Sequence, residues 1–118
     1  MANSKNVGTA NHFTAVTDAQ SLESLFTLSH SQPVIIFKHS TTCPISSAAH
    51  RQMSRVGAEV SLVVVQSARD VSNEIASRTG IRHESPQVIV LKNGEVVWSA
   101  SHFDIQADVV EQAVSKHA

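Results

Sequence analysis

The 118-residue chain has one cysteine, no cluster of lysine or arginine, and no long apolar run. One cysteine cannot form an internal disulfide, which agrees with a reducing compartment. The 9 basic and 10 acidic residues nearly cancel, which argues against a nucleic-acid partner. No stretch approaches the ~20 apolar residues of a membrane span. The polar residues 1–12 lack the apolar core of a signal peptide. We therefore expect a cytoplasmic protein that does not enter a membrane.

A protein-bound metal is also not expected, although the chain has seven histidines. No two of them have the i, i+4 or zinc-finger spacing of structural metal sites. His39 and Cys43 are four residues apart, but a predicted turn between a strand and a helix separates them. We expect no metal site and no tightly bound cofactor.

The single cysteine lies where a predicted strand meets a predicted helix. The apolar run 34–37 is typical of a buried strand, and residues 47–53 favour a helix. Pro44 suits the first turn of that helix, because its missing N–H would be unpaired there anyway. A sulfur at Cys43 would face unpaired N–H groups and the positive end of the helix dipole, which favour thiolate over thiol. The sequence therefore predicts a reactive thiol.

The alternative for Cys43 is a small buried hydrophobic residue, the usual state of a free cysteine. The polar residues 39–42 on its N-terminal side favour a loop instead. A reactive thiol is therefore the interpretation that we carry forward.

The remaining chain predicts alternating strands and helices. Residues 1–11 are small and polar, which predicts a flexible N-terminal tail, and residues 12–118 are expected to form a single domain. An Asn93-Gly94 pair between two apolar runs predicts a hairpin. Strands are expected at 13–16, 34–38, 60–65, 87–91 and 96–99; helices are expected from Thr17 or Asp18 to 28, from 44 to about Gly57, over 71–79, and from Phe103 or Asp104 onward.

This order predicts an α/β protein with a central mixed sheet and helices on both faces. It resembles the thioredoxin fold, with Cys43 at the exit of a core strand and Pro86 at the entrance of the hairpin. The resemblance implies a cis-proline at Pro86 that lies against the reactive sulfur. The alternative is an ordinary trans proline in a loop.

Four segments carry a closer resemblance: 37–47, 69–73, 80–87 and 98–102. Together they resemble the monothiol bacilliredoxin family, the YtxJ-type general stress proteins of the bacillithiol system. The resemblance implies a redox-active cysteine and a thiol-disulfide oxidoreductase of the stress response. Such an enzyme removes bacillithiol from S-bacillithiolated client proteins and takes it onto its own cysteine, here Cys43.

A single sulfur restricts the chemistry to a monothiol cycle. In dithiol enzymes a second cysteine resolves the mixed disulfide, but Ser46 stands at that position here. Cys43 would instead attack the small-thiol sulfur of the mixed disulfide and release the client thiol. A second bacillithiol, the co-substrate, would regenerate Cys43. A separate nicotinamide-dependent disulfide reductase would recycle the resulting symmetric disulfide.

Neighbours of the sulfur are candidates for stabilising the thiolate: Thr42, Pro44 and Ser46. The hydroxyls of Thr42 and Ser46 are expected to hydrogen-bond the sulfur. Simple capping of the helix start is an alternative that is compatible with this role.

Substrate contacts are expected around the proline. Ser85 would offer its backbone to an extended thiol ligand beside Pro86, with help from Gln87; the alternative for Ser85 is an ordinary strand-edge residue. His102 and Asp104 would add contacts from the start of the last helix, although an N-cap is the alternative for Asp104.

Positive charge is expected from Lys38, either near a ligand carboxylate or near the thiolate. His39 is a further candidate for this role. The alternative for both is a solvated surface position.

Two other functions stay open at this stage. One is a sensing or binding module in which Cys43 is modified without turnover. The other is an iron–sulfur cluster carrier, but single-cysteine glutaredoxins of that type have Gly-Phe-Ser after the cysteine, whereas this chain has Pro-Ile-Ser. We expect a monomer.

Overall fold

The computed structural model describes residues 12–118, so the predicted tail at 1–11 lies outside the described residues. Five strands form one sheet in the order β2-β4-β3-β5-β6. β2, β4 and β3 are parallel, whereas β5 pairs antiparallel with both β3 and β6. The mixed sheet is the one that the sequence predicts. Its strands are β2 (Phe13–Ala15), β3 (Val34–His39), β4 (Val60–Val64), β5 (Gln87–Lys92) and β6 (Glu95–Ser101).

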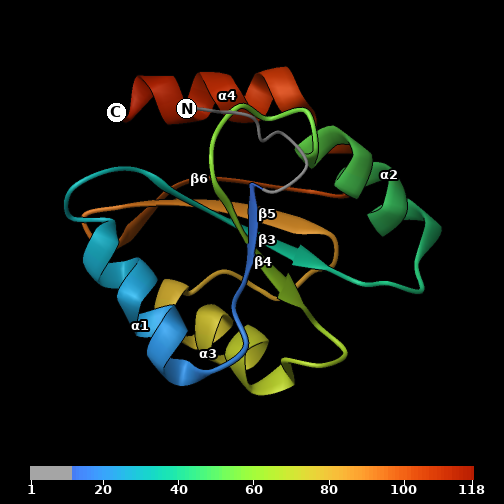
Figure 1. Cartoon of the computed structure of the whole chain (residues 1–118), viewed down its shortest axis with the longest axis horizontal. Helices are drawn as coiled ribbons and strands as arrows, with labels where there is room; N and C mark the ends of the chain where they lie inside the picture. The colour runs from blue at the N-terminus through green and yellow to red at the C-terminus, as the bar shows by residue number, and fades with distance from the viewer. Residues whose placement is uncertain (1–11) are drawn as a thin grey trace, which may run out of the picture.

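Helices cover both faces of this sheet (Figure 1). α1 (Ala19–Leu28) and α3 (Arg69–Thr79) pack against one face, and α2 (Pro44–Met53) and α4 (Ala107–Lys116) against the other. In the described part of the chain, no helix is long and apolar enough to cross a membrane.

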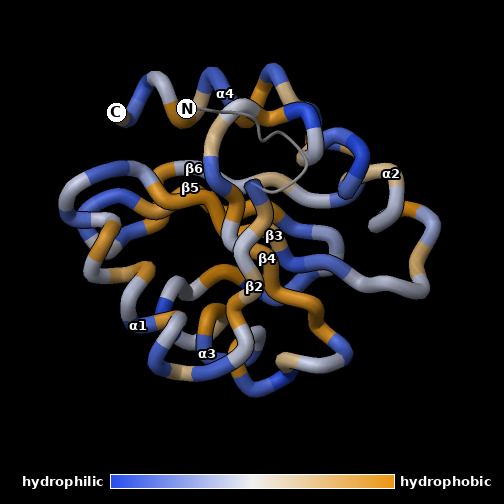
Figure 2. Tube along the Cα trace, viewed as in Figure 1, coloured by the Kyte–Doolittle hydropathy of each residue, from blue (hydrophilic) through white to orange (hydrophobic). Residues whose placement is uncertain are grey.

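The central strand β3 is buried at every position because helices cover it on both sides. Val34 and Ile36 face the core beneath α1 and α3. Ile35 and Phe37 face the second core beneath α2 and α4. Apolar residues accordingly concentrate along the middle of the sheet in Figure 2. The last two residues of β3 therefore bring polar side chains into covered positions.

Three short motifs end or join the elements as the sequence predicts. Asp18 caps α1, and hydrogen bonds from Ser21 hold the pKa of the Asp18 carboxyl below its usual value. Gly80 ends α3 with a φ of 73°. Asn93 and Gly94 have φ values of 56° and 76°, which a tight hairpin turn requires.

Buried Ser29 ties that hairpin turn to the end of α1. Its carbonyl oxygen accepts from Asn93 N–H at 2.7 Å, and its Oγ accepts from Gly94 N–H at 2.8 Å. The same Oγ donates to the carbonyl of Phe26 at 2.6 Å. One serine thus joins segments more than 60 residues apart.

Two predicted helix ends are wrong. α2 ends at Met53 rather than near Gly57, because the chain turns at Ser54 so that Val56 can be buried. The last helix begins at Ala107, with Gln106 as its N-cap. The N-cap alternative for Asp104 is therefore wrong.

The segment before α4 has a structure of its own. A short 3₁₀ helix, η2 (His102–Asp104), is followed by Ile105 in an extended conformation. Ile105 is 2% exposed and belongs to the core beneath α2 and α4. Burying this side chain requires a non-helical backbone there, so α4 starts later than its pattern of apolar residues indicates.

Candidate functional site

Cys43 is the N-cap residue of α2 and has an extended backbone with φ −107° and ψ 123°. Its thiol is half-buried, and Pro44 follows as the first helical residue. The carbonyl of Cys43 accepts from Ser47 N–H at 3.0 Å, the first bond of the helix. The sulfur therefore lies at the end of a helix where unpaired N–H groups and the dipole favour negative charge.

Ser46 makes hydrogen bonds to two residues of the segment that precedes Cys43. Its Oγ accepts from Ser40 N–H at 2.9 Å and lies 2.8 Å from His39 Nδ1. Both His39 and Ser46 are buried. In the part of the chain that the structure describes, the Ser46 hydroxyl bonds to these two groups rather than to the sulfur. The residue at the resolving position is thus a support for the active loop.

Gln66, just after β4, holds the same loop from the outside. Its Oε1 accepts from Thr41 N–H at 3.3 Å. Its Nε2 donates to Ser40 Oγ at 2.9 Å and to Thr42 Oγ1 at 3.2 Å. The Thr42 hydroxyl, predicted to bond the sulfur, is therefore bonded to a side-chain amide. The sequence contains no local signal for Gln66, because 24 to 26 residues separate the partners.

A cluster of rings lies beneath the loop on the α2 side: His12, Phe13, Phe37, His39 and His50. His39 and His50 have ring centroids 4.9 Å apart, and His50 stacks on Phe13 at 4.7 Å. Burial, followed by the charge of His50, lowers the pKa of His39. Burial and the charge of His12 lower the pKa of His50. The surroundings of His39 and His50 therefore favour neutral imidazoles at these two residues.

The Ser85–Pro86 peptide bond is cis, the isomer expected for a proline at this position. Two contacts hold this segment to the start of η2. His102 N–H donates to the carbonyl of Pro86 at 3.1 Å. His102 Nδ1 lies 3.2 Å from Glu84 Oε1. His102 also lines a hollow of about 240 Å³ with Ile45, two residues after Cys43, so it connects the proline segment to α2.

Two buried polar side chains, Lys38 and Gln87, lie on the face of the sheet that α1 and α3 cover. Lys38 and Gln87 are directly opposite in the β3–β5 ladder, so their side chains share a face. Lys38 is 0% exposed, and burial lowers its pKa to about 8. Lys38 Nζ, Gln87 Oε1 and Ser85 Oγ have no hydrogen-bond partner within residues 12–118. Lys38 is therefore not a solvated surface residue, and a ligand outside the protein does not touch its ammonium group.

The structure gathers some predicted site residues and separates others. Gln87 is buried, and its Nε2 donates to the carbonyl of Arg82 at 3.0 Å. Ser85 and Pro86 form one segment with it. Asp104 is exposed on η2. Within residues 12–118, no group of three histidine, cysteine or acidic side chains is placed to hold a metal ion.

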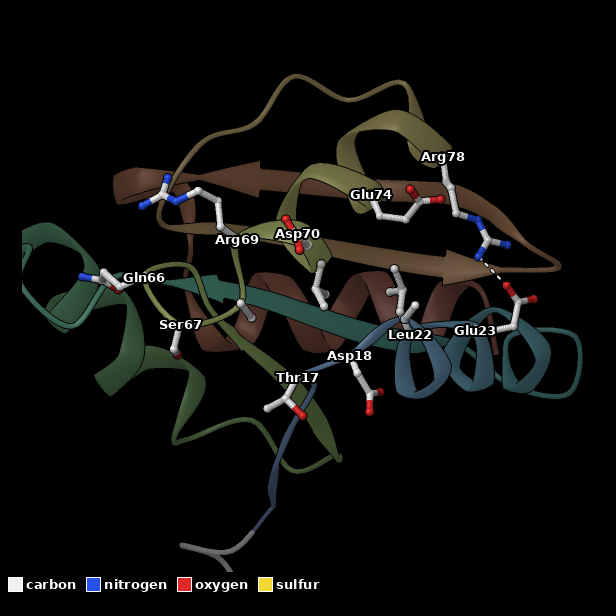
Figure 3. Close-up of a pocket in the computed structure, with 13 residues that line it drawn as sticks. Thr17, Asp18, Leu22, Glu23, Gln66, Ser67, Arg69, Asp70, Glu74 and Arg78 are labelled. Atoms are coloured by element: carbon white, nitrogen blue, oxygen red, sulfur yellow. Dashed lines mark hydrogen bonds and ion pairs between the residues drawn. The ribbon is translucent and has the colours of Figure 1, made fainter.

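A pocket of about 660 Å³ opens between α1 and α3 and extends to Gln66 (Figure 3). Leu22 and Val71 contribute apolar lining, whereas Asp18, Asp70, Glu74 and Arg69 contribute charge. The pocket therefore adjoins the residue that holds the Cys43 loop.

Solved structures with the same fold include several thioredoxins. Another, a protein of suggested oxidoreductase activity with a thioredoxin fold, is 32% identical, with a TM-score of 0.81 over 92% of this chain and 98% of that one. The thioredoxin of Fasciola hepatica is 13% identical, with a TM-score of 0.69 over 88% and 98%. That of Trypanosoma brucei brucei is 9% identical, with a TM-score of 0.72 over 94% of both chains. These likenesses show that the chain has a thioredoxin fold.

The family comparison is more specific. Residues 14–110 match the family described as monothiol bacilliredoxin BrxC, and this match includes Cys43, the cis-proline segment and η2. Together with the fold, the match supports a redox function. The chain belongs to the monothiol bacilliredoxin family.

Proposed function

We propose that this protein is a thiol-disulfide oxidoreductase that removes bacillithiol from S-bacillithiolated client proteins. The observation that carries the proposal is the place of Cys43, the only cysteine of the chain, at the start of α2. Ser46 occupies the resolving position, and a hydroxyl cannot exchange with a disulfide. Only a monothiol cycle is therefore available to one chain.

The first step is a thiol-disulfide exchange. The Cys43 thiolate attacks the bacillithiol sulfur of the mixed disulfide, one S–S bond forms, and the original S–S bond breaks. The client leaves as a thiolate, so charge and electrons balance. We assign Ser85 and Pro86 to pairing with the extended thiol ligand, and the contacts of His102 hold that segment in place.

The second step regenerates Cys43. A further bacillithiol thiolate attacks the mixed disulfide on Cys43, and a symmetric bacillithiol disulfide leaves. A separate nicotinamide-dependent reductase then supplies the two electrons that return this disulfide to two thiols. We place this cycle in the cytoplasm, as part of a response to oxidative stress, with the protein acting as a monomer.

Mass spectrometry of the reduced protein mixed with a bacillithiolated client tests the proposal. We expect the client to lose the small thiol while Cys43 gains it, one adduct per protein molecule. The Cys43→Ala variant provides the matched control and is expected to leave the client modified. Excess bacillithiol should then give many turnovers.

Two results would contradict the proposal. Reaction that stops after one equivalent in excess bacillithiol would indicate a sensor. A client that keeps its modification while Cys43 stays free would remove the reductase function altogether.

A further inference from the structure

The side chains of Arg69 and His83 lie near each other at the start of α3. Arg69 is the first residue of this 11-residue helix, and Ser72 lies three residues later on the same side. His83 Nδ1 lies 3.2 Å from Ser72 Oγ, so the His83 ring rests against the first turn of the helix beside Arg69. Burial, the charge of Lys38 and the charge of Arg69 lower the pKa of His83, which favours a neutral imidazole.

A second cation, Lys38, lies on the sheet beneath them. Lys38 faces the same side of the sheet as Gln87, whose amide reaches the carbonyl of Arg82 next to His83. After burial, the charge of Lys38 is the largest cause of the lowered pKa of His83. With its own pKa at about 8, Lys38 keeps its proton at neutral pH although it is fully buried and its Nζ has no acceptor in residues 12–118.

Acidic residues compensate this charge only in part. Glu84 opposes the lowering of the His83 pKa, but its carboxylate is also close to His102. Arg78, at the other end of α3, forms a 2.7 Å ion pair with Glu23. Arg69 forms no such pair within the described residues, although Asp70 follows it in the helix. A buried charge without a counter-ion is costly, and an anion placed nearby reduces that cost.

The position of this cluster connects it with the thiol. His83 is two residues from Ser85, and Arg69 is three residues from Gln66, which holds the Cys43 loop. Figure 3 shows Arg69 and Gln66 extending to the same side, away from Arg78 at the opposite end of the pocket. The N-terminal end of α3 adds its own partial positive charge.

We propose that Arg69, beside the uncharged ring of His83 and above the charge of the buried Lys38, binds the carboxylate group of an anionic small thiol during its transfer to Cys43. This assignment rests on the proposed function, since it names the chemical class of that substrate. Arg69 supplies the direct ion pair. Lys38 acts through its field alone, because its ammonium group is covered.

Small disulfides of similar length and different charge test the assignment. The rates of mixed-disulfide formation at Cys43 are measured by mass spectrometry with 3,3′-dithiodipropionate, 2-hydroxyethyl disulfide and cystamine. In each reaction one S–S bond breaks, one forms, and one small thiolate leaves. We expect the anionic disulfide to react about fivefold faster than the neutral one, the equivalent of one ordinary charge interaction. The net charge of −1 would by itself favour cystamine.

The Arg69→Met variant should bring the rates with the anionic and neutral disulfides to within about twofold of each other. Arg55→Met is the matched control, because Arg55 is an exposed arginine just after α2. It should keep the wild-type preference. Raising the salt concentration should weaken the wild-type preference, as expected for a partly exposed charge pair.

The outcomes separate the two proposals. Equal preferences in wild type and Arg69→Met, with Cys43 still reactive, overturn the anion site and leave the reductase function intact. A wild-type preference for cystamine does the same. If Cys43 reacts with none of the three disulfides, the proposed function itself fails and the anion site fails with it.

Discussion

Lys38 and His39 are neighbours on β3, and both are buried, but they lie on opposite faces of the sheet. His39 is satisfied: Nδ1 contacts Ser46, and the ring packs against Phe37 and His50. Lys38 has no partner for its ammonium group within residues 12–118. One face of the sheet therefore supports the cysteine loop with completed bonds, whereas the other holds a charge without a counter-ion. An unsatisfied buried charge can act on a ligand at a distance through its field, whereas a polar residue that is hydrogen-bonded within the protein is a candidate for support.

Replacing the unsatisfied residue should have the largest effect on stability. The Lys38→Met variant removes a buried charge and keeps an unbranched side chain. Since burial lowers the Lys38 pKa from 10.5 to about 8, the charge costs the folded state about 3 kcal/mol at neutral pH. We expect the free energy of unfolding to rise by up to that amount, measured by urea denaturation at pH 7.

The pH dependence sharpens this prediction. Between pH 8 and 10.5 the folded wild type binds fewer protons at Lys38 than the unfolded chain, so its stability rises with pH in this window. The advantage of Lys38→Met should therefore be complete below pH 8 and should shrink as the pH rises to 10.5. A variant that is less stable than wild type at pH 7 would contradict the view that Lys38 is an unpaired charge.

Removing the Ser46 hydroxyl should change the free energy of unfolding by less than Lys38→Met does, and in the opposite direction. Ser46→Ala leaves Ser40 N–H and His39 Nδ1 without their shared partner. Unsatisfied buried groups cost 1–3 kcal/mol each, and solvent reaches the half-buried Ser40, so we expect a loss of about 2 kcal/mol. Ser47→Ala is the control at an exposed position of the same helix and should change stability by less than about 0.5 kcal/mol. Equal effects of the two changes would remove the supporting role of Ser46.

The smallest effect on stability is expected from replacing His50 in the ring cluster. Burial and the charge of His12 lower the pKa of His50, so the folded protein resists protonation there and loses stability as the pH falls from 7 toward 5. His50→Phe keeps the stacking on Phe13 and removes the titration. Its stability should fall less steeply over this range. A His50→Phe variant that keeps the wild-type slope would contradict the prediction.

Local patterns were enough to predict much of the fold. The buried character of Val34–Phe37, the break at Gly80 and the Asn93-Gly94 turn each depend on properties of adjacent residues, so a single sequence shows them. The places of Cys43 and Pro86 follow from these elements. The substrate class and the role of each neighbour of the sulfur stay predictions.

The contacts around the loop depend on distant residues, so the sequence does not show them. Gln66 can hydrogen-bond Thr41 and Thr42 only because β3 and β4 are neighbouring parallel strands whose ends lie side by side. A lysine at the end of a strand suggests exposure, but Lys38 lies in a strand that is covered on both faces. Asp104 has the character of an N-cap, and the requirement to bury Ile105 moves the helix start beyond it.

The bonds of Ser29 have a consequence for how the chain unfolds. The β5–β6 hairpin lies at an edge of the sheet, where a strand pair opens most easily. Its turn, however, is fastened to the end of α1 through both the carbonyl and the hydroxyl of Ser29. The hairpin turn cannot separate from α1 unless the hydrogen bonds from Asn93 and Gly94 to Ser29 break. This single residue therefore makes the N-terminal helix and the C-terminal hairpin parts of one cooperative unit.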